Sequence, residues 1–200
     1  AVCEAAKQEI IRRYYSVLCA RRQGNASDDA VLKVELMMSQ AGISVRDRPV
    51  VAPTLERAQK TGLPAAAIEL GDGTIVTGKT SALLGASAAA LLNALKVLGG
   101  IQHEIHLISP IIIEPIQNLK TRHLGNQNPR LHTDVILIAL SICAATNPTA
   151  ELAMRQLWRL RGCEAHSSVI LSHVDDTTLR RLGLNLTSEP QYQTKKLYHK

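Results

Sequence analysis

The sequence predicts an α/β protein in which a small helical unit, residues 1–62, precedes an α/β/α sandwich over residues 63–188. In the helical unit, apolar side chains recur at the three- and four-residue spacing of amphipathic helices, and a glycine follows each stretch. After Pro64, short strand-like runs alternate with longer helical patterns, which is typical of a sheet covered on both faces. Residues 189–200 are polar, and we expect them to form a frayed tail.

Three helices are expected in the helical unit. They span residues 4–23, 27–42 and 53–60, and Gly24, Gly42 and Gly62 stand where helices commonly end in a left-handed residue. Ser27 is followed by two aspartates, a composition that caps a helix start and favours its dipole.

The sandwich is expected to begin with a β-hairpin, because residues 65–70 and 74–77 are strand-like and flank Gly71-Asp72-Gly73. An alanine- and leucine-rich helix follows over residues 81–98, with Ser87 as its candidate N-cap. The remaining expected elements are a strand at 103–108, helices at 111–124, 133–145 and 147–161, a strand at 164–171, a helix at 175–182 and a strand at 184–187. Asp175 or Asp176 is the candidate N-cap of the helix that ends at residue 182.

Composition disfavours several classes of function. The net charge is +6, but one Trp, four Tyr and no Phe provide few stacking platforms for single-stranded nucleic acid. The basic residues are better interpreted as solvated helix faces, and a small anionic ligand or an acidic partner stays open as the alternative. No stretch reaches the roughly 18 apolar residues of a membrane span. Four scattered cysteines favour reduced thiols and a cytoplasmic location. The chain opens on Ala1 without a signal-peptide pattern, and we interpret it as a piece of a longer polypeptide.

Residues 73–80 satisfy the spacing of a phosphate-binding loop: Gly, four residues, then Gly-Lys-Thr. The four intervening residues, Thr-Ile-Val-Thr, are all β-branched and favour an extended strand over a curled loop. We therefore interpret this match as a strand rather than a nucleoside triphosphate site. A weaker hypothesis stays open, in which Gly78, Lys79, Thr80 and Ser81 offer a cation, hydroxyls and amides to some anion.

A second candidate anion site lies between two expected helices. Its basic members are Lys120, Arg130 and His132, and the loop leads into a helix start that could add its dipole. In the alternative interpretation these are ordinary surface residues around a polar turn. The sequence does not identify a catalytic residue or a cofactor, and whether the chain is an enzyme stays open.

The order of hairpin, helix, strand and helix resembles the cytidine deaminase-like fold. Those enzymes hold zinc with a His or Cys at the start of the helix after the hairpin and with a Cys-x-x-Cys pair, and a nearby Glu transfers protons. Residues 85–89 are Gly-Ala-Ser-Ala-Ala, and no Cys-x-x-Cys exists in the chain. We therefore expect no metal site and no deaminase chemistry.

Four segments together resemble the C-terminal part of a bacterial family catalogued as domain of unknown function eighteen forty-six: residues 66–80, 106–110, 128–134 and 162–166. The resemblance implies a cytoplasmic protein more than twice this size, whose N-terminal half is a partner of this chain. Members have been labelled ATP-dependent peptidases, but no Ser-His-Asp, Cys-His or zinc-protease arrangement can be assembled from this sequence.

Two functional hypotheses follow. The first is a binding domain for a phosphorylated or nucleotide-like small molecule, with a pocket that joins Lys79 and Thr80 to the loop of Arg130 and His132. The second is a structural or oligomerisation module, in which the apolar helices at 87–98 and 135–145 bury against another subunit.

Overall fold

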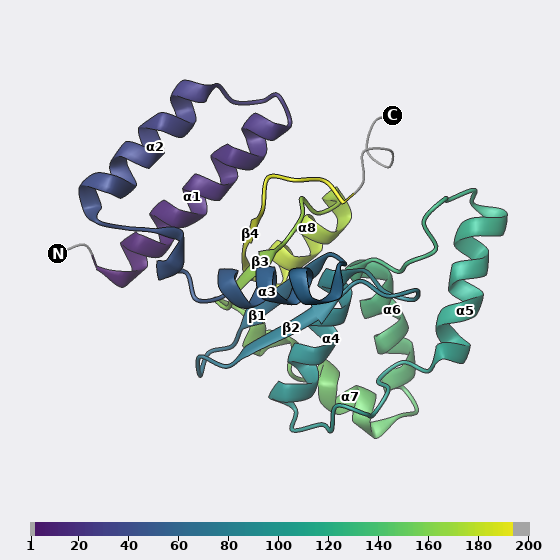
Figure 1. Ribbon diagram of the computed structural model, residues 1–200. Helices are drawn as coiled ribbons and strands as arrows, with labels where there is room; N and C mark the ends of the chain where they lie inside the picture. Colours follow the sequence, from purple (N-terminus) through teal and green to yellow (C-terminus); the bar gives the residue numbers. More distant parts are fainter. Residues whose placement is uncertain (1–2, 194–200) are drawn as a thin grey trace.

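The computed structural model describes residues 3–193 of the 200-residue chain. It is a mixed α/β structure with eight α-helices and a four-stranded sheet in the described range (Figure 1). The helices are α1 (Glu4–Arg22), α2 (Asp28–Ala41), α3 (Val51–Thr61), α4 (Ala86–Leu98), α5 (Pro110–Asn118), α6 (Thr133–Ala144), α7 (Pro148–Met154) and α8 (His173–Arg181). The strands are β1 (Ala65–Glu69), β2 (Ile75–Lys79), β3 (Glu164–Ser167) and β4 (Asn185–Ser188).

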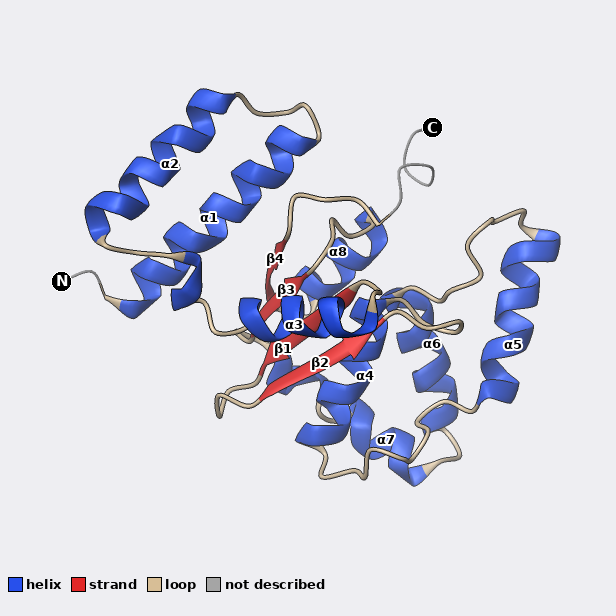
Figure 2. Cartoon of the chain, in the orientation of Figure 1, coloured by secondary structure: helices blue, strands red, loops and turns tan. Residues whose placement is uncertain are grey.

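The strand order is β2-β1-β3-β4. Strand β1 pairs antiparallel with both β2 and β3, whereas β3 and β4 run parallel. Helix α3 crosses one face of the sheet and α4 lies behind the other, as Figure 2 shows. The main core fills the α4 side and includes Ile68, Leu91, Leu95 and Ile136.

Helices α1 and α2 form an antiparallel hairpin beside the sheet (Figure 1). The predicted cap is confirmed, because the Ser27 hydroxyl accepts the Ala30 N–H at 3.3 Å. Gly42 ends α2 in the left-handed conformation with φ of +64°. A small second core, which includes Ile11, Tyr15 and Val34, holds the two helices together. The division at residue 62 stays a prediction; α3 itself packs on the sheet.

The β-hairpin is confirmed, with Gly73 at φ of +83° in its turn. Gly78 serves packing in this hairpin. A Cβ atom added there would lie 2.1 Å from the backbone nitrogen of Ala90 in α4, so only glycine permits this close approach of β2 and α4.

The predicted strand at 103–108 is wrong: these residues form turns and bends, and the sheet in the described range has four strands. Residues 103–106 are exposed, and only Leu107 and Ile108 reach the core. The predicted helix at 111–124 is α5 followed by a π-helical turn, Leu119–His123, and the helix at 147–161 is α7 followed by a 3₁₀ turn, Leu157–Leu160. Another 3₁₀ turn, Val45–Asp47, precedes α3.

Two predicted helix caps also differ. Gly85, not Ser87, is the N-cap of α4, and Ser172 caps α8 through the Asp175 N–H. Strand β3 ends at Ser167 rather than at 171. Within residues 3–193 no helix combines the length and apolar character needed to cross a bilayer. Part of the predicted polar tail, residues 194–200, lies outside the described range.

Candidate functional site

Two distant segments meet at the N-terminal end of α4. The Leu131 N–H donates to the Leu83 carbonyl at 3.0 Å, and the Gly85 N–H donates to the Leu131 carbonyl at 3.3 Å. These two backbone bonds hold the segment of Arg130 and His132 beside the first turn of α4.

A small polar cavity, which we call the α4 cavity, lies at this junction. Its volume is about 40 Å³, room for about three waters or one compact tetrahedral group. The polar residues that line it are Thr80, Ser87, Asn128, Arg130, His132, Ser172, Asp175 and Gln193.

The first turn of α4 supplies backbone donors to the cavity. The N–H groups of Ala86 and Ser87 lie in the first turn of the helix, where no intrahelical carbonyl is available to accept them, and neither has a hydrogen-bond partner within residues 3–193. Both residues are buried, at 6% and 3% exposure. Buried backbone donors are almost always paired in native proteins, so these two call for an acceptor in the cavity.

Two hydroxyl groups accompany these amides. The side chains of Thr80 and Ser87 are buried, and their hydroxyls bond to no residue in the described part of the chain. Thr80 is fixed in place by its backbone, because its N–H donates to the Pro64 carbonyl at 2.9 Å. The hydroxyls therefore add two orientable hydrogen-bonding groups to a rigid wall.

His132 is held by the buried carboxylate of Asp175. Its Nδ1 lies 2.7 Å from Asp175 Oδ2, while Asp175 Oδ1 accepts the Thr133 N–H at 2.8 Å. Burial would raise the pKa of Asp175, but the hydrogen bonds from His132 and Thr133 outweigh it and lower the pKa below its usual range. Asp175 is therefore charged at neutral pH and keeps a proton on Nδ1 of His132.

Ser172, His132 and Asp175 do not form a nucleophilic triad. The Ser172 hydroxyl donates to Asp175 Oδ2 at 3.0 Å and lies 3.4 Å from the same ring nitrogen, Nδ1, that Asp175 occupies. A triad requires the hydroxyl on the opposite ring nitrogen, so that the histidine can take its proton. Ser172 instead helps to orient the pair.

The structure brings together three of the seven predicted anion-binding residues, Thr80, Arg130 and His132. Ser81 and Lys120 support them from outside the cavity lining. Arg130 Nε donates to the Ser81 carbonyl at 2.9 Å, and Lys120 Nζ donates to the Arg130 carbonyl at 2.6 Å.

The other two predicted residues lie outside the cavity lining. Gly78 sits under α4, and Lys79 ends β2 with an exposed side chain. Residues 75–79 are extended, so the stretch with phosphate-loop spacing is a strand.

Sequence reasoning missed Ser87 and Asp175 as site residues and interpreted both as helix caps. The signal in each case was a polar residue close to a helix start. Only the fold shows that Ser87 lies one residue inside α4, with its hydroxyl at the cavity, and that Asp175 points back to another helix.

Neither the cavity nor any other part of residues 3–193 gathers three or more His, Cys, Asp or Glu side chains in an arrangement suited to a metal ion. Cys163, the buried thiol before β3, has its pKa raised by burial and bonds to the Arg159 carbonyl at 3.4 Å. The polar groups of the cavity include hydrogen-bond donors, two amide side chains and one histidine–aspartate pair.

These features define a mixed α/β protein with a polar, anion-sized cavity at the N-terminal end of a buried helix. Residues 46–198 match the sequence model "Domain of unknown function DUF1846, C-terminal", and residues 1–42 match its N-terminal counterpart. The chain belongs to this family, as the resemblance predicted. The boundary between the two matches falls after α2.

Similar proteins occur in several bacteria. A UPF0371 protein of Corynebacterium efficiens is 57% identical over 200 residues, which is all of this chain and 40% of that relative. A UPF0371 protein of Corynebacterium glutamicum is 54% identical over 201 residues, and one of Streptococcus pyogenes is 50% identical over 200 residues. The chain spans about 40% of the length of these curated relatives.

Proposed function

We propose that this chain is a binding domain for a phosphorylated or nucleotide-like small molecule, whose anionic group occupies the α4 cavity. The observation that carries the proposal is the convergence of the buried N–H groups of Ala86 and Ser87 with the hydroxyls of Thr80 and Ser87. All four lack a partner within residues 3–193. A tetrahedral oxyanion has the acceptors that these donors need.

Charge supports the same ligand class. The N-terminal end of α4 carries the positive end of its helix dipole. Arg130 donates from Nε to the Ser81 carbonyl, and this leaves its two terminal nitrogens for a ligand at the cavity mouth. Because the cavity holds about 40 Å³, it accepts the anionic group alone, and the rest of the ligand extends outward.

We also propose that the deaminase-like resemblance describes this fold. Support comes from the antiparallel hairpin, the helix that follows it, and the position of the cavity at the start of that helix. The strand expected at 103–108 is absent from the described residues, which limits the likeness to the β1, β2 and α4 unit with its neighbouring strands.

A thermal-shift experiment tests the binding proposal. A ligand at 100 times its Kd stabilises the folded state by about 2.7 kcal/mol, which raises Tm of a chain this size by about 5–10 °C. We expect such a shift with a phosphorylated compound from a panel of inorganic phosphate, nucleotides and phosphosugars. The shift should be lost in Arg130→Ala and kept in Arg122→Ala, an exposed arginine nearby. No shift across the panel, or equal loss in both variants, would contradict the proposal.

Assembly through α6 is the second candidate function. Of the two helices predicted to meet another subunit, α4 is already buried in its own core, whereas α6 leaves Ile138 and Ile142 at 60% and 65% exposure. These two residues lie one turn apart and form an apolar strip. Sedimentation velocity should show a concentration-dependent oligomer that Ile142→Glu dissociates; a monomer at all concentrations would exclude this candidate.

A further inference from the structure

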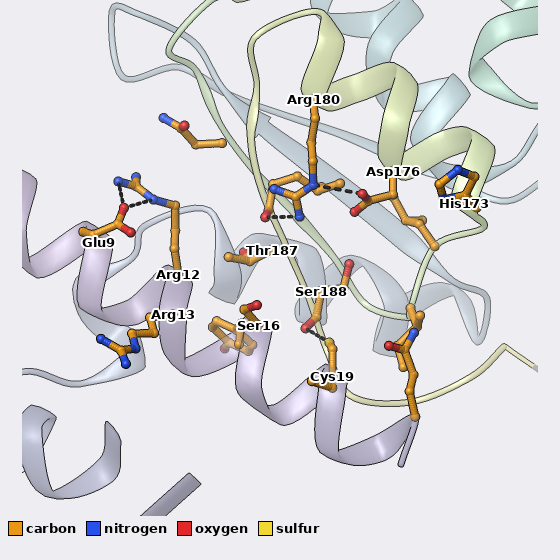
Figure 3. Close-up of a pocket in the computed structure, with 17 residues that line it drawn as sticks. Glu9, Arg12, Arg13, Ser16, Cys19, His173, Asp176, Arg180, Thr187 and Ser188 are labelled. Carbon is orange, nitrogen blue, oxygen red and sulfur yellow. Dashed lines mark hydrogen bonds and ion pairs between the residues drawn. The ribbon is translucent and has the colours of Figure 1, made fainter. Parts of the chain in front are cut away.

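A second cavity lies at the free edge of the sheet, on the other side of Ile170 and Leu171 from the α4 cavity. Its volume is about 740 Å³, and it runs between α1 on one side and α8 on the other, over β4 (Figure 3). We call it the β4 cleft. Its α1 wall belongs to the part matched by the N-terminal family model, and its α8 and β4 walls to the C-terminal part.

The floor of the cleft is the open edge of β4. The N–H groups of Asn185 and Glu189 donate to β3 or its extension, at 2.9 Å each. Because parallel pairing uses alternate residues, the N–H groups of Leu186 and Ser188 point to the free edge. Neither has an acceptor within residues 3–193.

The carbonyl groups on the same edge are bonded only by side chains that can move away. Arg180 donates to the Leu186 carbonyl at 3.2 Å, and the Cys19 thiol, a weak donor, lies 3.2 Å from the Ser188 carbonyl. Figure 3 shows these two side chains reaching the strand from opposite walls. An incoming strand can replace both bonds with backbone hydrogen bonds.

The walls fix the size and shape of an occupant. On α1 the lining residues recur at helical spacing from Glu9 to Gln23, a length of about 20 Å at 1.5 Å per residue. A strand of about six residues has the same length. Because helical walls stand on both sides of the strand edge, the cleft suits one isolated extended segment better than the edge of another sheet.

The strand itself lacks two of the features that commonly block edge pairing, a charge and a proline. Residues 185–188 are Asn-Leu-Thr-Ser, without a charge or a proline. The two helical walls protect the edge from other sheets and leave it open to a single chain.

The charges of the cleft favour an acidic occupant. Arg12 is paired with Glu9 and Glu164, and Arg180 is paired with Asp176. Arg13 also lines the cleft and has no ion pair in the described part of the chain. The lining therefore carries one cation that an acidic side chain can neutralise.

We propose that the β4 cleft binds an extended acidic peptide segment of about six residues from another polypeptide, which adds to the sheet as a fifth strand beside β4. Backbone bonds to Leu186 and Ser188 provide the affinity, and Arg13 selects acidic side chains. The proposal is independent of the α4 cavity, because the two sites share only Ile170 and Leu171 in their linings.

A titration followed by amide NMR tests this proposal. The probe is an acetylated, amidated hexapeptide of alternating threonine and glutamate, added to the 200-residue chain up to about 1 mM, the range of weak peptide complexes. We expect the amide signals of Leu186 and Ser188 to shift and their hydrogen exchange to slow by about tenfold. The fully N-methylated hexapeptide cannot donate to the Leu186 and Ser188 carbonyls, and its methyl groups obstruct close strand pairing, so it should leave both signals unchanged.

Three variants complete the test. Ser16→Trp places a large side chain on the exposed α1 wall and should abolish the shifts, whereas Lys33→Trp on the exposed side of α2 should not. Arg13→Glu should weaken the glutamate peptide about tenfold and favour a threonine–lysine peptide, while Arg46→Glu should change neither. Unchanged Leu186 and Ser188 signals at the highest concentration, or equal binding of the N-methylated peptide, would overturn the proposal.

Discussion

Two polar clusters lie inside this molecule, and they differ in whether the protein satisfies its own polar groups. In the first, Arg48 is fully buried at the junction of the α1–α2 hairpin and the sheet. It donates to Glu164, to the Thr187 hydroxyl at 3.0 Å and to the carbonyl of Asn185 at 2.8 Å. Arg12 of α1 donates to the second oxygen of Glu164 at 2.7 Å.

In the second cluster, the α4 cavity, several hydrogen-bond donors have no acceptor among the described residues. The amides of the buried residues Ala86 and Ser87, and the hydroxyls of Thr80 and Ser87, have no partner in residues 3–193. A cluster whose polar groups bond to one another stabilises the fold. A cluster whose polar groups lack partners within the protein can bind a ligand or ordered water. Substitutions in the two places should therefore separate stability from binding.

The largest expected effect is the loss of stability in Arg48→Met. Removal of the arginine leaves the Glu164 carboxylate without its buried partner, and breaking such a pair costs about 3–5 kcal/mol. Urea unfolding followed by circular dichroism measures the change. Arg46→Met, at an exposed position two residues away, is the matched control and should stay within about 0.5 kcal/mol of wild type.

Gly78→Ala should come next, at about 3 kcal/mol of lost stability. Its new methyl group collides with the backbone of Ala89 and Ala90, which cannot rotate away as a side chain would. Gly73→Ala should cost only about 1 kcal/mol, because its surroundings are open and the strain is limited to its positive φ. Equal small effects at both positions would show that β2 does not approach α4 this closely.

Asp175→Asn should cost about 1–2 kcal/mol at neutral pH, where the charged hydrogen bonds to His132 and Thr133 are present. The folded-state pKa of Asp175 is lowered, so this stability is present above the unfolded pKa of about 3.9 and is lost as pH falls through the folded value. The difference between the unfolding free energies of the two proteins, measured from pH 7 to pH 3, should therefore decrease as the pH falls below about 3.9. A difference in unfolding free energy that stays constant with pH would contradict the stabilising role of the Asp175 charge.

The smallest effect on stability is expected for Ser87→Ala and Thr80→Val, because neither hydroxyl bonds to a described residue. We expect less than about 1 kcal/mol in urea unfolding. The same variants should lose the Tm increase produced by the phosphorylated ligand. A large loss of stability in either variant would show that these hydroxyls stabilise the fold, as the Arg48 cluster does, and would contradict their role in binding.

The sequence predicted the parts of this fold that depend on neighbouring residues. The Ser27 cap, the left-handed Gly42 and the glycine-rich hairpin turn each act within a few positions of the chain. The prediction of a strand at 103–108 failed because a strand-like sequence forms a strand only where another strand can pair with it. The structure provides no such partner among the described strands.

The candidate site was predicted only in part for a related reason. Arg130 and His132 stood out as a polar loop, and Thr80 as part of a motif, but Ser87 and Asp175 had a sufficient local explanation as helix caps. Arg48 resembled any surface arginine. Its buried role depends on Glu164, 116 positions along the chain, and no local pattern marks that pairing.

The most direct test of the central claim is a titration of the chain with inorganic phosphate, followed through its backbone amide signals. If the anion occupies the α4 cavity, the signals of Ala86 and Ser87 should shift most, with saturation, and sulfate should compete. If the signals of residues 73–79 shift instead, the stretch with phosphate-loop spacing holds the anion and the α4 cavity does not. Unchanged signals at Ala86 and Ser87 with phosphate and with every phosphorylated compound of the panel would contradict the account.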